Sequence, residues 1–487
     1  MSDQMLERSL KFIILLIALI LLAILVIPFT AEAQTSIYRS VQYDGDGTSA
    51  ALATGTGNNL TISGTTATFA SALPDTVGVG CAIQYDDDND GDIDANDSIC
   101  FIHGRTSSTV FTVATAAGGT PTATAAADQD WSIFHAYTSW VNMEAGTENN
   151  GIDADLRAFD AGNRDIGGAN EDWYVAFYAG SETIGAAAID FTGWTTGSNR
   201  IIKFFTPSSS SEVGRSQRHS GTWTGTCYSI TKTDVDNKGI FDSPNTLSNF
   251  WIDGLQFYVN VRSNAGECYA MRFVNGTNIA NIQVSNCIMR GLYDATATSR
   301  RRTGIYVNNL DNAASTLKIW NNIIYSFWTP FDATRVGGIH FDATNCNGTA
   351  YIYNNTLDSC RYSIVGNDGT VYAKNNIVQR TQDGFNGANF HADSNYNISD
   401  VASDAPGANS KNSTSVSFVS AANKNFLLQA NDTAAKDAGT NTVTSDISAT
   451  STDILGTARP QGAAFDIGAH EVSGTSATLK RRRAIIQ

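Results

Sequence analysis

Three stretches, "LKIWNNII" (317–324), "AYIYNNTL" (350–357) and "VYAKNNIV" (371–378), repeat one pattern, apolar-x-apolar-x-Asn-x-apolar. "IQVSNCIM" (282–289) follows the same pattern, and "FWIDGLQF" (250–257) follows it with Gly254 in place of the asparagine. The shared asparagines are Asn286, Asn321, Asn354 and Asn375, at spacings of 35, 33 and 21 residues. Short strands repeating every ~20 residues or more predict a β-solenoid, in which stacked coils bury a common core.

A second short strand is expected in each unit, at "TGIYV" (303–307), "GGIHF" (337–341) and "YSIVG" (362–366). The asparagine is placed where the chain turns sharply, because Asn tolerates the left-handed backbone region. Identical amides stacked from coil to coil can also hydrogen-bond along the axis as a ladder. An antiparallel β-sandwich with Asn-rich turns is the alternative, and the recurrence of the pattern in phase favours the solenoid.

The repeated Asn-Asn pattern resembles the right-handed parallel β-helix proteins of the pectate-lyase-like kind. The stretch "DILGTARPQGAAFDIGAHE" (453–471) is similar to the signature that closes bacterial secreted β-helix proteins of the choice-of-anchor type. In those proteins the signature is roughly D-x-x-G-x-x-R-P followed by D-I-G-A-x-E. The resemblance covers about residues 140–472. It implies an all-β, right-handed parallel β-helix that reaches the cell surface, and it implies little about activity.

An export signal is expected at the N-terminus. Arg8 and Lys11 precede the apolar run 12–27, and Ala31-Glu32-Ala33 fits a cleavage site. An uncleaved anchor is the alternative, and both place the body of the protein outside the cytoplasm. The expected organisation is a signal peptide (1–33), an N-terminal β domain (34–136), the β-helix with an N-terminal cap (137–405), its C-terminal end or anchor-type region (406–472) and a basic tail (473–487).

The charge of the chain excludes one class of partner, and its cysteines bear on which disulfides can form. The formal charge of −16 argues against nucleic acid, whose phosphates require a basic surface. All seven cysteines follow the signal, and an exported protein permits disulfides, with at least one thiol left free. Cys81 and Cys100 bracket an acidic loop and could be bridged across a hairpin. The basic "TLKRRRAIIQ" (478–487) is expected to help to retain the protein at the cell envelope, peripherally or through an anchor.

That acidic loop, "YDDDNDGDIDAND" (85–97), fits the template of a calcium-binding loop. A hard cation takes six to eight oxygen ligands, and a tight turn at Gly91 would fold alternate side chains toward one point. The expected Ca²⁺ ligands are Asp86, Asp88, Asp90, Asp92 and Asp97. The flanking residues read as strands, so the loop is expected on a β-hairpin with a structural role. A solvated acidic turn is the alternative.

The sequence does not identify catalytic residues. A glycosidase needs two placed carboxylates, and none of the candidates Asp253, Asp311, Asp332, Asp342 and Asp358 forms an adjacent pair. His340 stands alone. The run Arg300-Arg301-Arg302 could bind an acidic sugar, although a charged run in a loop is usually solvated.

Aromatic residues give the stronger signal for binding. If Ile319, Ile352 and Ala373 face inward, strand alternation places Trp320, Tyr353 and Lys374 outward in one row, and Lys318, Tyr351 and Tyr372 in a second. Exposed aromatic rings can stack on sugar rings; cover by the insertions or by the C-terminal region is the alternative. The sequence therefore predicts a secreted or cell-surface, non-catalytic, adhesin-like or glycan-binding protein with structural calcium. Its predicted partner is an extracellular polysaccharide or cell-surface glycan. A polysaccharide lyase or glycoside hydrolase is the alternative.

Overall fold

The computed structural model describes residues 34–45, 50–186, 188–197, 199–234, 237–243, 246–261, 266–276, 278–294, 301–330, 336–342 and 346–474. The expected signal peptide and the basic stretch 478–487 lie outside these ranges. Every element named below belongs to one compact unit, Thr35–Gln487. Among the described residues, no helix is long and apolar enough to cross a membrane.

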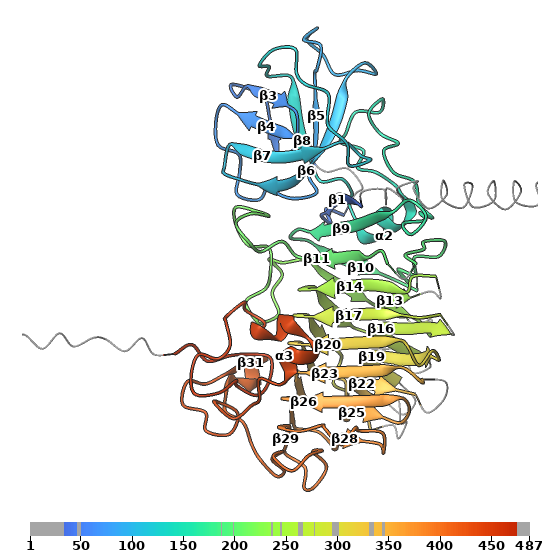
Figure 1. The fold of residues 1–487 in the computed structure, drawn as a ribbon, viewed down its shortest axis with the longest axis vertical. Coiled ribbons are helices and arrows are strands. Elements are labelled where there is room, and N and C mark those ends of the chain that lie inside the picture. The colour runs from blue at the N-terminus through green and yellow to red at the C-terminus, as the bar shows by residue number, and fades with distance from the viewer. Residues whose placement is uncertain are drawn as a thin grey trace, which may run out of the picture. The chain divides into compact units, whose positions relative to one another are not determined.

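Three parallel sheets form a β-helix, which confirms the predicted fold class (Figure 1). Sheet 1 contains β1 (Thr35–Val41), β9 (Glu171–Phe177), β11 (Ile202–Phe205), β14 (Asn249–Asp253), β17 (Asn281–Ser285), β20 (Thr316–Trp320), β23 (Thr349–Tyr353) and β26 (Thr370–Lys374). Sheet 2 contains β10 (Ser181–Ile184), β12 (Ser229–Lys232), β15 (Gln256–Val259), β18 (Ile288–Arg290), β21 (Ile323–Tyr325), β24 (Thr356–Asp358), β27 (Ile377–Gln379) and β29 (Ile398–Ser399). Sheet 3 contains β13 (Gly239–Ser243), β16 (Glu267–Gly276), β19 (Arg301–Leu310), β22 (Gly337–Phe341), β25 (Tyr362–Gly366) and β28 (Asp383–Asn386).

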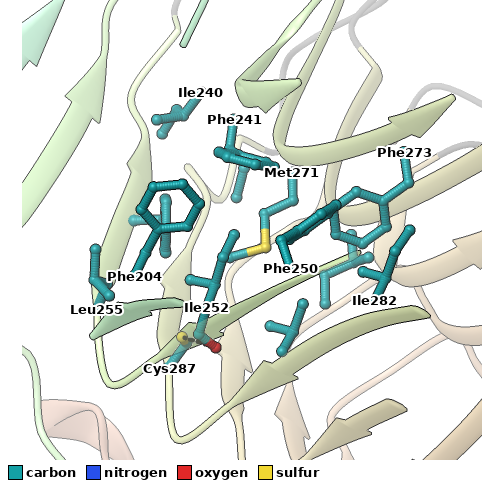
Figure 2. Close-up of a cluster of buried hydrophobic side chains, with 14 of the residues drawn as sticks. Phe204, Ile240, Phe241, Phe250, Ile252, Leu255, Met271, Phe273, Ile282 and Cys287 are labelled. Carbon is teal, nitrogen blue, oxygen red and sulfur yellow. Dashed lines mark hydrogen bonds between the residues drawn. The ribbon is translucent and has the colours of Figure 1, made fainter. Parts of the chain in front are cut away.

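Inward-facing apolar side chains of successive coils form one continuous core. Figure 2 shows part of it, where Phe204, Phe250, Ile252, Met271 and Phe273 pack together. Each of these side chains is 0% exposed. Strand register stacks like on like, so that Ile252 lies beside Val284 and Ile319 beside Ile352. No coil could bury this surface alone, which explains why the repeat is needed.

The N-terminal β domain is inserted into the β-helix. Its antiparallel sheet contains β2 (Ala53–Thr54), β3 (Leu60–Ser63), β4 (Thr66–Phe69), β5 (Ala82–Tyr85), β6 (Ser98–Arg105), β7 (Val110–Ala114) and β8 (Trp131–Phe134). Strand β1 precedes this domain but pairs with β9 in sheet 1. The expected boundary at residue 34 therefore differs from the structure, because a single isolated strand carries no repeat pattern that could assign it to the solenoid.

A short helix, α2 (Trp140–Ala145), lies between this domain and the next coil. The Ser139 side chain accepts a hydrogen bond from the Asn142 amide at 2.9 Å and so caps the N-terminus of the helix. Trp140 is 0% exposed and packs against Phe177, Phe204 and Phe241. The helix thus covers apolar rings at the N-terminal end of the core.

Each repeated stretch contains two strands joined by a sharp turn at the first asparagine. In one coil β23 ends at Tyr353, Asn354 has φ 54°, and β24 begins at Thr356. Asn286, Asn321 and Asn375 have φ values of 52°, 56° and 56°, and Gly254 has φ 84° at the equivalent place. The asparagine therefore provides the left-handed residue that redirects the chain from sheet 1 to sheet 2.

The continuous amide ladder lies one residue beyond the predicted one. It consists of Asn322, Asn355, Asn376 and Asn397, each 0% exposed. Oδ1 of Asn355 accepts hydrogen bonds from the backbone N and the Nδ2 of Asn322, both at 3.0 Å, and the same pair of bonds recurs at the next two steps. In the expected ladder one amide pair is bonded, Asn321 to Asn286 at 3.3 Å, and the Asn354 amide has no partner among the described residues. The first asparagine sets the backbone and the second supplies the hydrogen bonds.

Cys81 and Cys100, which could have been bridged, form no disulfide, and both thiols are buried. Cys100 lies opposite Ile83, while the Cys81 carbonyl accepts a hydrogen bond from Ile102 N at 2.9 Å. The two cysteines are thus diagonal neighbours, for which Cα atoms are about 7–8 Å apart, whereas a disulfide needs about 4.4–6.8 Å. Burial also raises the pKa of the Cys81 thiol to about 11.

The C-terminal segment, residues 413–472, folds back over the outside of the β-helix (Figure 1). It contains β30 (Phe418–Ser420), β31 (Asn425–Leu428), α3 (Val443–Asp446) and two 3₁₀ turns (Ala421–Asn423 and Ser448–Ser451). Outward isoleucines of sheet 2 pack against this segment, namely Ile288, Ile323, Ile377 and Ile398. Their burial converts an apolar outer face of the solenoid into a second core.

The closing motif, residues 453–471, holds this segment together. Arg459 Nη1 lies 3.1 Å from Glu471 Oε2, and both side chains are 0% exposed. The guanidinium also donates to the carbonyls of Asp466 (2.9 Å) and Gly468 (2.8 Å). Gly468 N in turn donates to the Asn375 carbonyl of the solenoid at 2.8 Å. The motif is therefore a structural clamp that docks the segment at the corner between sheets 1 and 2.

Asn355→Leu tests the amide ladder. The buried Asn355 side chain accepts hydrogen bonds from Asn322 N and Nδ2 and donates one to the Ile319 carbonyl, all at 3.0 Å, and leucine would remove all three. We expect a loss of about 2–4 kcal/mol, because each buried polar group left unpaired costs roughly 1–3 kcal/mol. The measurement is the urea midpoint. Asn354→Gly is the matched control, which keeps the left-handed turn and should change the midpoint little; equal losses for both variants would contradict the assignment.

Glu471→Gln tests the clamp. The change removes the carboxylate that pairs with the buried Arg459 guanidinium, and breaking such a pair typically costs about 3–5 kcal/mol. We expect proteolysis to release residues 413–472 at urea concentrations at which the β-helix stays intact. Lys436→Gln, a surface change in the same segment, serves as the control. Simultaneous loss of the segment and the β-helix in both proteins would count against a separate clamp.

Candidate functional site

Two of the predicted ligand-binding residues are covered. Trp320 is 1% exposed and Tyr353 is 0% exposed, beneath Val443, Ile447 and Phe465 of the C-terminal segment. The Tyr353 hydroxyl donates to Asp446 Oδ2 at 2.7 Å. Both residues do point outward from sheet 1, as strand alternation predicts, but the returning chain buries them. The prediction that they are exposed is therefore wrong, and the alternative, cover by the C-terminal region, is confirmed.

Tyr351, Tyr372 and Lys374 lie half-buried on the same sheet. The two tyrosine rings stack at 5.2 Å with an interplanar angle of 16°, and Tyr372 stacks on His391 at 4.2 Å. Lys374 Nζ is 3.7 Å from Asp446 Oδ2. Tyr372 lies between Tyr351 and His391, so both faces of its ring are occupied. This row suits solenoid stacking better than the predicted stacking on a sugar.

The candidate carboxylates lie apart, each with its own partners. Asp253 ends a strand of sheet 1, Asp358 ends one of sheet 2, and Asp342 follows one of sheet 3. Burial favours the neutral form of Asp253, but Arg218 Nη2 at 2.6 Å and Lys203 Nζ at 3.7 Å outweigh it and lower its pKa to about 2. Asp358 is 1% exposed on its side chain and forms an ion pair with Arg380.

The remaining acidic candidates and the arginine run give no catalytic arrangement. Asp342 accepts a hydrogen bond from the Tyr306 hydroxyl at 2.5 Å. Asp311 is partly exposed after β19, and its Oδ1 accepts a hydrogen bond from Asn347 at 2.5 Å. Arg301 pairs with Glu267, and Arg302 is 1% exposed and donates to the Leu292 carbonyl at 2.8 Å. Asp332 and Arg300 lie outside the described residues.

Polar side chains also line the outside of sheet 3. Arg272 makes two bonds to Asp242, at 2.7 and 2.8 Å, and Tyr306 stacks on His340 at 5.6 Å. Tyr306 and His340 are each only 2% exposed. His340, which stands alone in the sequence, is thus a buried member of a stacked row.

An accessible site lies instead at the turns that follow sheet 2. A groove of about 550 Å³ is lined by Tyr293, Trp328, Ser359, Arg380, Thr381, Gln382 and Lys424. All but Lys424 come from the turns after β18, β21, β24 and β27, and Lys424 lies between β30 and β31. We call it the Tyr293–Trp328 groove.

The two aromatic residues form a platform. Arg290 of β18 pairs with Tyr325 of β21, so Tyr293 and Trp328, each three residues further on, occupy equivalent places on adjacent coils. Their rings stack at 5.0 Å with an interplanar angle of 21°. Tyr293 is 53% exposed, among the most exposed large apolar side chains in the described residues. Trp328 supports it from the next coil.

The rest of the lining is polar or basic. Arg380 adopts a left-handed backbone (φ 53°), and its side chain is 46% exposed while it pairs with the buried Asp358. Lys424 is exposed. The Ser359 hydroxyl donates to Asp358 Oδ1 at 2.9 Å. No acidic residue lines the groove, although the chain has 47 acidic and 31 basic residues.

Sequence reasoning missed this groove because its aromatic residues lie in insertions of unequal length. A usable signal was present: Tyr293 follows Asn286 by seven residues, and Trp328 follows Asn321 by the same interval. The equivalent places on the next two coils are Arg361 and Gln382. These four positions, Tyr293, Trp328, Arg361 and Gln382, align when residues are counted from the asparagine of each coil, but not when the insertions are compared with each other.

The acidic loop joins β5 to β6, as expected for a hairpin. Asp86 is 2% exposed, and its carboxylate accepts hydrogen bonds from the amides of Asp88 (3.1 Å), Asn89 (2.5 Å) and Gly91 (2.9 Å). Asp97 likewise accepts from Asp87 N (3.1 Å) and Asp94 N (2.8 Å). These bonds fold the loop around the two carboxylates at its ends.

The loop brings together some of the five expected metal ligands. Carboxylate oxygens of Asp86, Asp88 and Asp97 lie within 4.8 Å of one another, and Asp86 forms a second such group with Asp128 and Asp130. Asp90 and Asp92 are exposed and belong to neither group. The neighbouring Asp90 carboxylate raises the pKa of Asp92. Calcium binding remains a prediction.

Comparison with known proteins adds no assignment: no family model, no curated protein and no solved structure matches the chain.

We expect calcium to raise the melting temperature, because a ligand that binds only the folded state stabilises it by about 2.7 kcal/mol at a hundred times its dissociation constant. Asp88→Asn and Asp97→Asn should abolish the increment. Asp92→Asn, in the same loop but outside the close group, should retain it. Calorimetry with calcium or with EDTA provides the measurement. An unchanged wild-type curve, or an equal loss in all three variants, would rule the site out.

Proposed function

We propose that the protein is a secreted or cell-surface β-helix that binds an extracellular polysaccharide, without cleaving it, in the Tyr293–Trp328 groove. The observation that carries this proposal is the stacked aromatic pair, with Tyr293 53% exposed, at the wall of a groove of about 550 Å³. Such a volume falls within the range of about 300–1,000 Å³ that small-ligand sites occupy.

The chemistry of the lining suits a sugar. An aromatic ring offers an apolar face to the C–H groups of a pyranose, and the tyrosine hydroxyl adds a polar edge. Ser359, Thr381 and Gln382 provide hydroxyl and amide groups that can bond to sugar hydroxyls. Placement on four consecutive coils gives these groups a rigid support, which limits the entropy lost on binding.

The lining supports binding over hydrolysis. A glycoside hydrolase uses two carboxyl groups about 5–9.5 Å apart across the scissile bond. Among the described residues, those that line the groove include no carboxylate, and the nearby Asp358 is buried and paired with Arg380. A polysaccharide lyase is the alternative activity, and the assay below includes its product.

Export and attachment complete the proposal. The apolar run 12–27 with its cleavage-like site supports secretion, and the similarity of residues 453–471 to the choice-of-anchor signature supports a place at the cell envelope. Calcium in the 86–97 loop would stiffen the hairpin of the N-terminal domain. A rigid surface protein that presents a glycan-binding groove would act in the manner of an adhesin.

Tyr293→Ala and Trp328→Ala should each weaken binding to a polysaccharide found by glycan-array screening. We expect a loss of at least about tenfold, since removal of a central aromatic contact typically costs more than about 1–2 kcal/mol. Tyr372→Ala, which removes a half-buried ring from sheet 1, is the control and should leave affinity unchanged. Calorimetric titration gives the affinities.

Two results would contradict the proposal. One is equal affinity in wild type and both groove variants, which would place the site elsewhere. The other is the appearance of unsaturated sugar products or new reducing ends on incubation with the bound polysaccharide, which would establish an enzyme.

A further inference from the structure

A second groove lies on the N-terminal coils. It has a volume of about 760 Å³ and is built mostly by the segment between β11 and β12. Its lining is rich in hydroxyl groups, with five serine and threonine side chains, and it also contains Arg215, Arg218 and Trp223. We call it the Arg215–Trp223 groove.

Trp223 connects this groove to the outer face of sheet 2. The Arg290 guanidinium lies 4.0 Å from the centre of the Trp223 ring and 3.8 Å from that of Tyr258. All three side chains are half-buried, so each keeps a surface open to solvent. Arg290 Nε has no hydrogen-bond partner among the described residues.

The Trp223–Arg290–Tyr258 cluster adjoins the Tyr293–Trp328 groove. Arg290 and Tyr293 are three residues apart, so their Cα atoms are at most about 11 Å apart. The cluster therefore bridges the two grooves along the outer face of sheet 2, at its neighbouring strands β15 and β18. Together the three features form one track of aromatic rings, hydroxyl groups and guanidinium groups.

The charge of this track is opposite to that of the protein. The two linings contain Arg215, Arg218, Arg380 and Lys424 and no acidic residue, on a chain of net charge −16. Arg218 forms an ion pair with the buried Asp253, and Arg380 forms one with the buried Asp358. Arg215 and Lys424 are exposed, one at each groove, and among the described residues neither side chain forms an ion pair.

We infer that one chain of an anionic polysaccharide occupies both grooves at once. The inference rests on the proposed function and adds to it the charge and the length of the ligand. Arg215 and Lys424 provide a cation at each groove for carboxylate or sulfate groups of the chain. Trp223 and Tyr293 provide an aromatic contact in each groove.

Simultaneous occupation has a measurable consequence. Once one groove is filled, the second contact becomes intramolecular and benefits from a high effective concentration. Affinity should therefore rise steeply with chain length until the ligand reaches across both grooves. Additional length beyond that point should have little further effect.

The test uses alginate oligomers of defined length for carboxylate, dextran sulfate for sulfate, and dextran as the neutral polymer, each titrated calorimetrically into the full chain. We expect long alginate or dextran sulfate to bind at least tenfold more tightly than both dextran and the shortest alginate oligomer. The better of the two anionic polymers identifies the charged group. Equal affinity for neutral and anionic polymers, or no dependence on length, overturns the inference.

Variants separate the two grooves. Trp223→Ala should abolish the higher affinity for long oligomers and leave the affinity for short oligomers within twofold of wild type. Tyr293→Ala should lower the affinity for short and long oligomers alike. Arg215→Gln, an exposed change that should leave the melting temperature unaltered, should lower affinity for long anionic chains about tenfold. Arg157→Gln, outside both linings, is its control. An equal effect of Arg215→Gln on short and long oligomers would overturn the inference.

The failure of this inference differs from failure of the proposed function. Binding that depends on Tyr293 and Trp328 but not on length or charge retains the proposed function and overturns the two-groove track. Absence of any Tyr293-dependent binding overturns both.

Discussion

The turn from sheet 1 to sheet 2 constrains the rest of the molecule. In the repeated stretches the chain must bend sharply within two residues while its polar backbone stays buried. The left-handed Asn354 makes the bend, and the buried Asn355 then saturates the carbonyls and amides that the bend leaves inside. Because the Asn355 amide also bonds to Asn376 on the next coil, each turn fixes the position of its neighbour. The ladder thus holds the successive coils from Asn322 to Asn397 in register at this corner.

The same corner receives the C-terminal segment. Gly468 donates to the Asn375 carbonyl and has φ 98°, a backbone conformation that residues with a side chain rarely adopt, so glycine is required here. The Arg459–Glu471 pair then fixes the segment in a shape that covers the isoleucines of sheet 2 and the aromatic row of sheet 1. The clamp therefore decides which outer faces of the solenoid remain accessible. The C-terminal segment leaves turns of the solenoid accessible, and both grooves lie at such turns.

A solenoid assigns stability to its buried core and leaves ligand binding to its outward turns. The core repeats and tolerates little change, because every inward side chain contacts the coils above and below it. The turns face outward and accept insertions of different lengths without disturbing the stack. Tyr293 and Trp328 occur at the start of two such insertions, at equivalent positions, and so gain a fixed spacing from the core while they remain free to contact a ligand. Binding chemistry on a rigid support is the result.

The sequence by itself determined the solenoid, its two-strand template and the left-handed corner, because these depend on local periodicity and on the backbone preference of asparagine. It also placed the acidic loop on a hairpin. It did not determine which asparagine of each pair is buried, since the two are adjacent and identical in type, nor the cross-strand offset that separates Cys81 from Cys100. Only the tertiary structure decided that Trp320 and Tyr353 are covered and Tyr293 is exposed. The contacts responsible join residues about a hundred positions apart, such as Tyr353 and Asp446, and no local pattern encodes where a returning chain will pack.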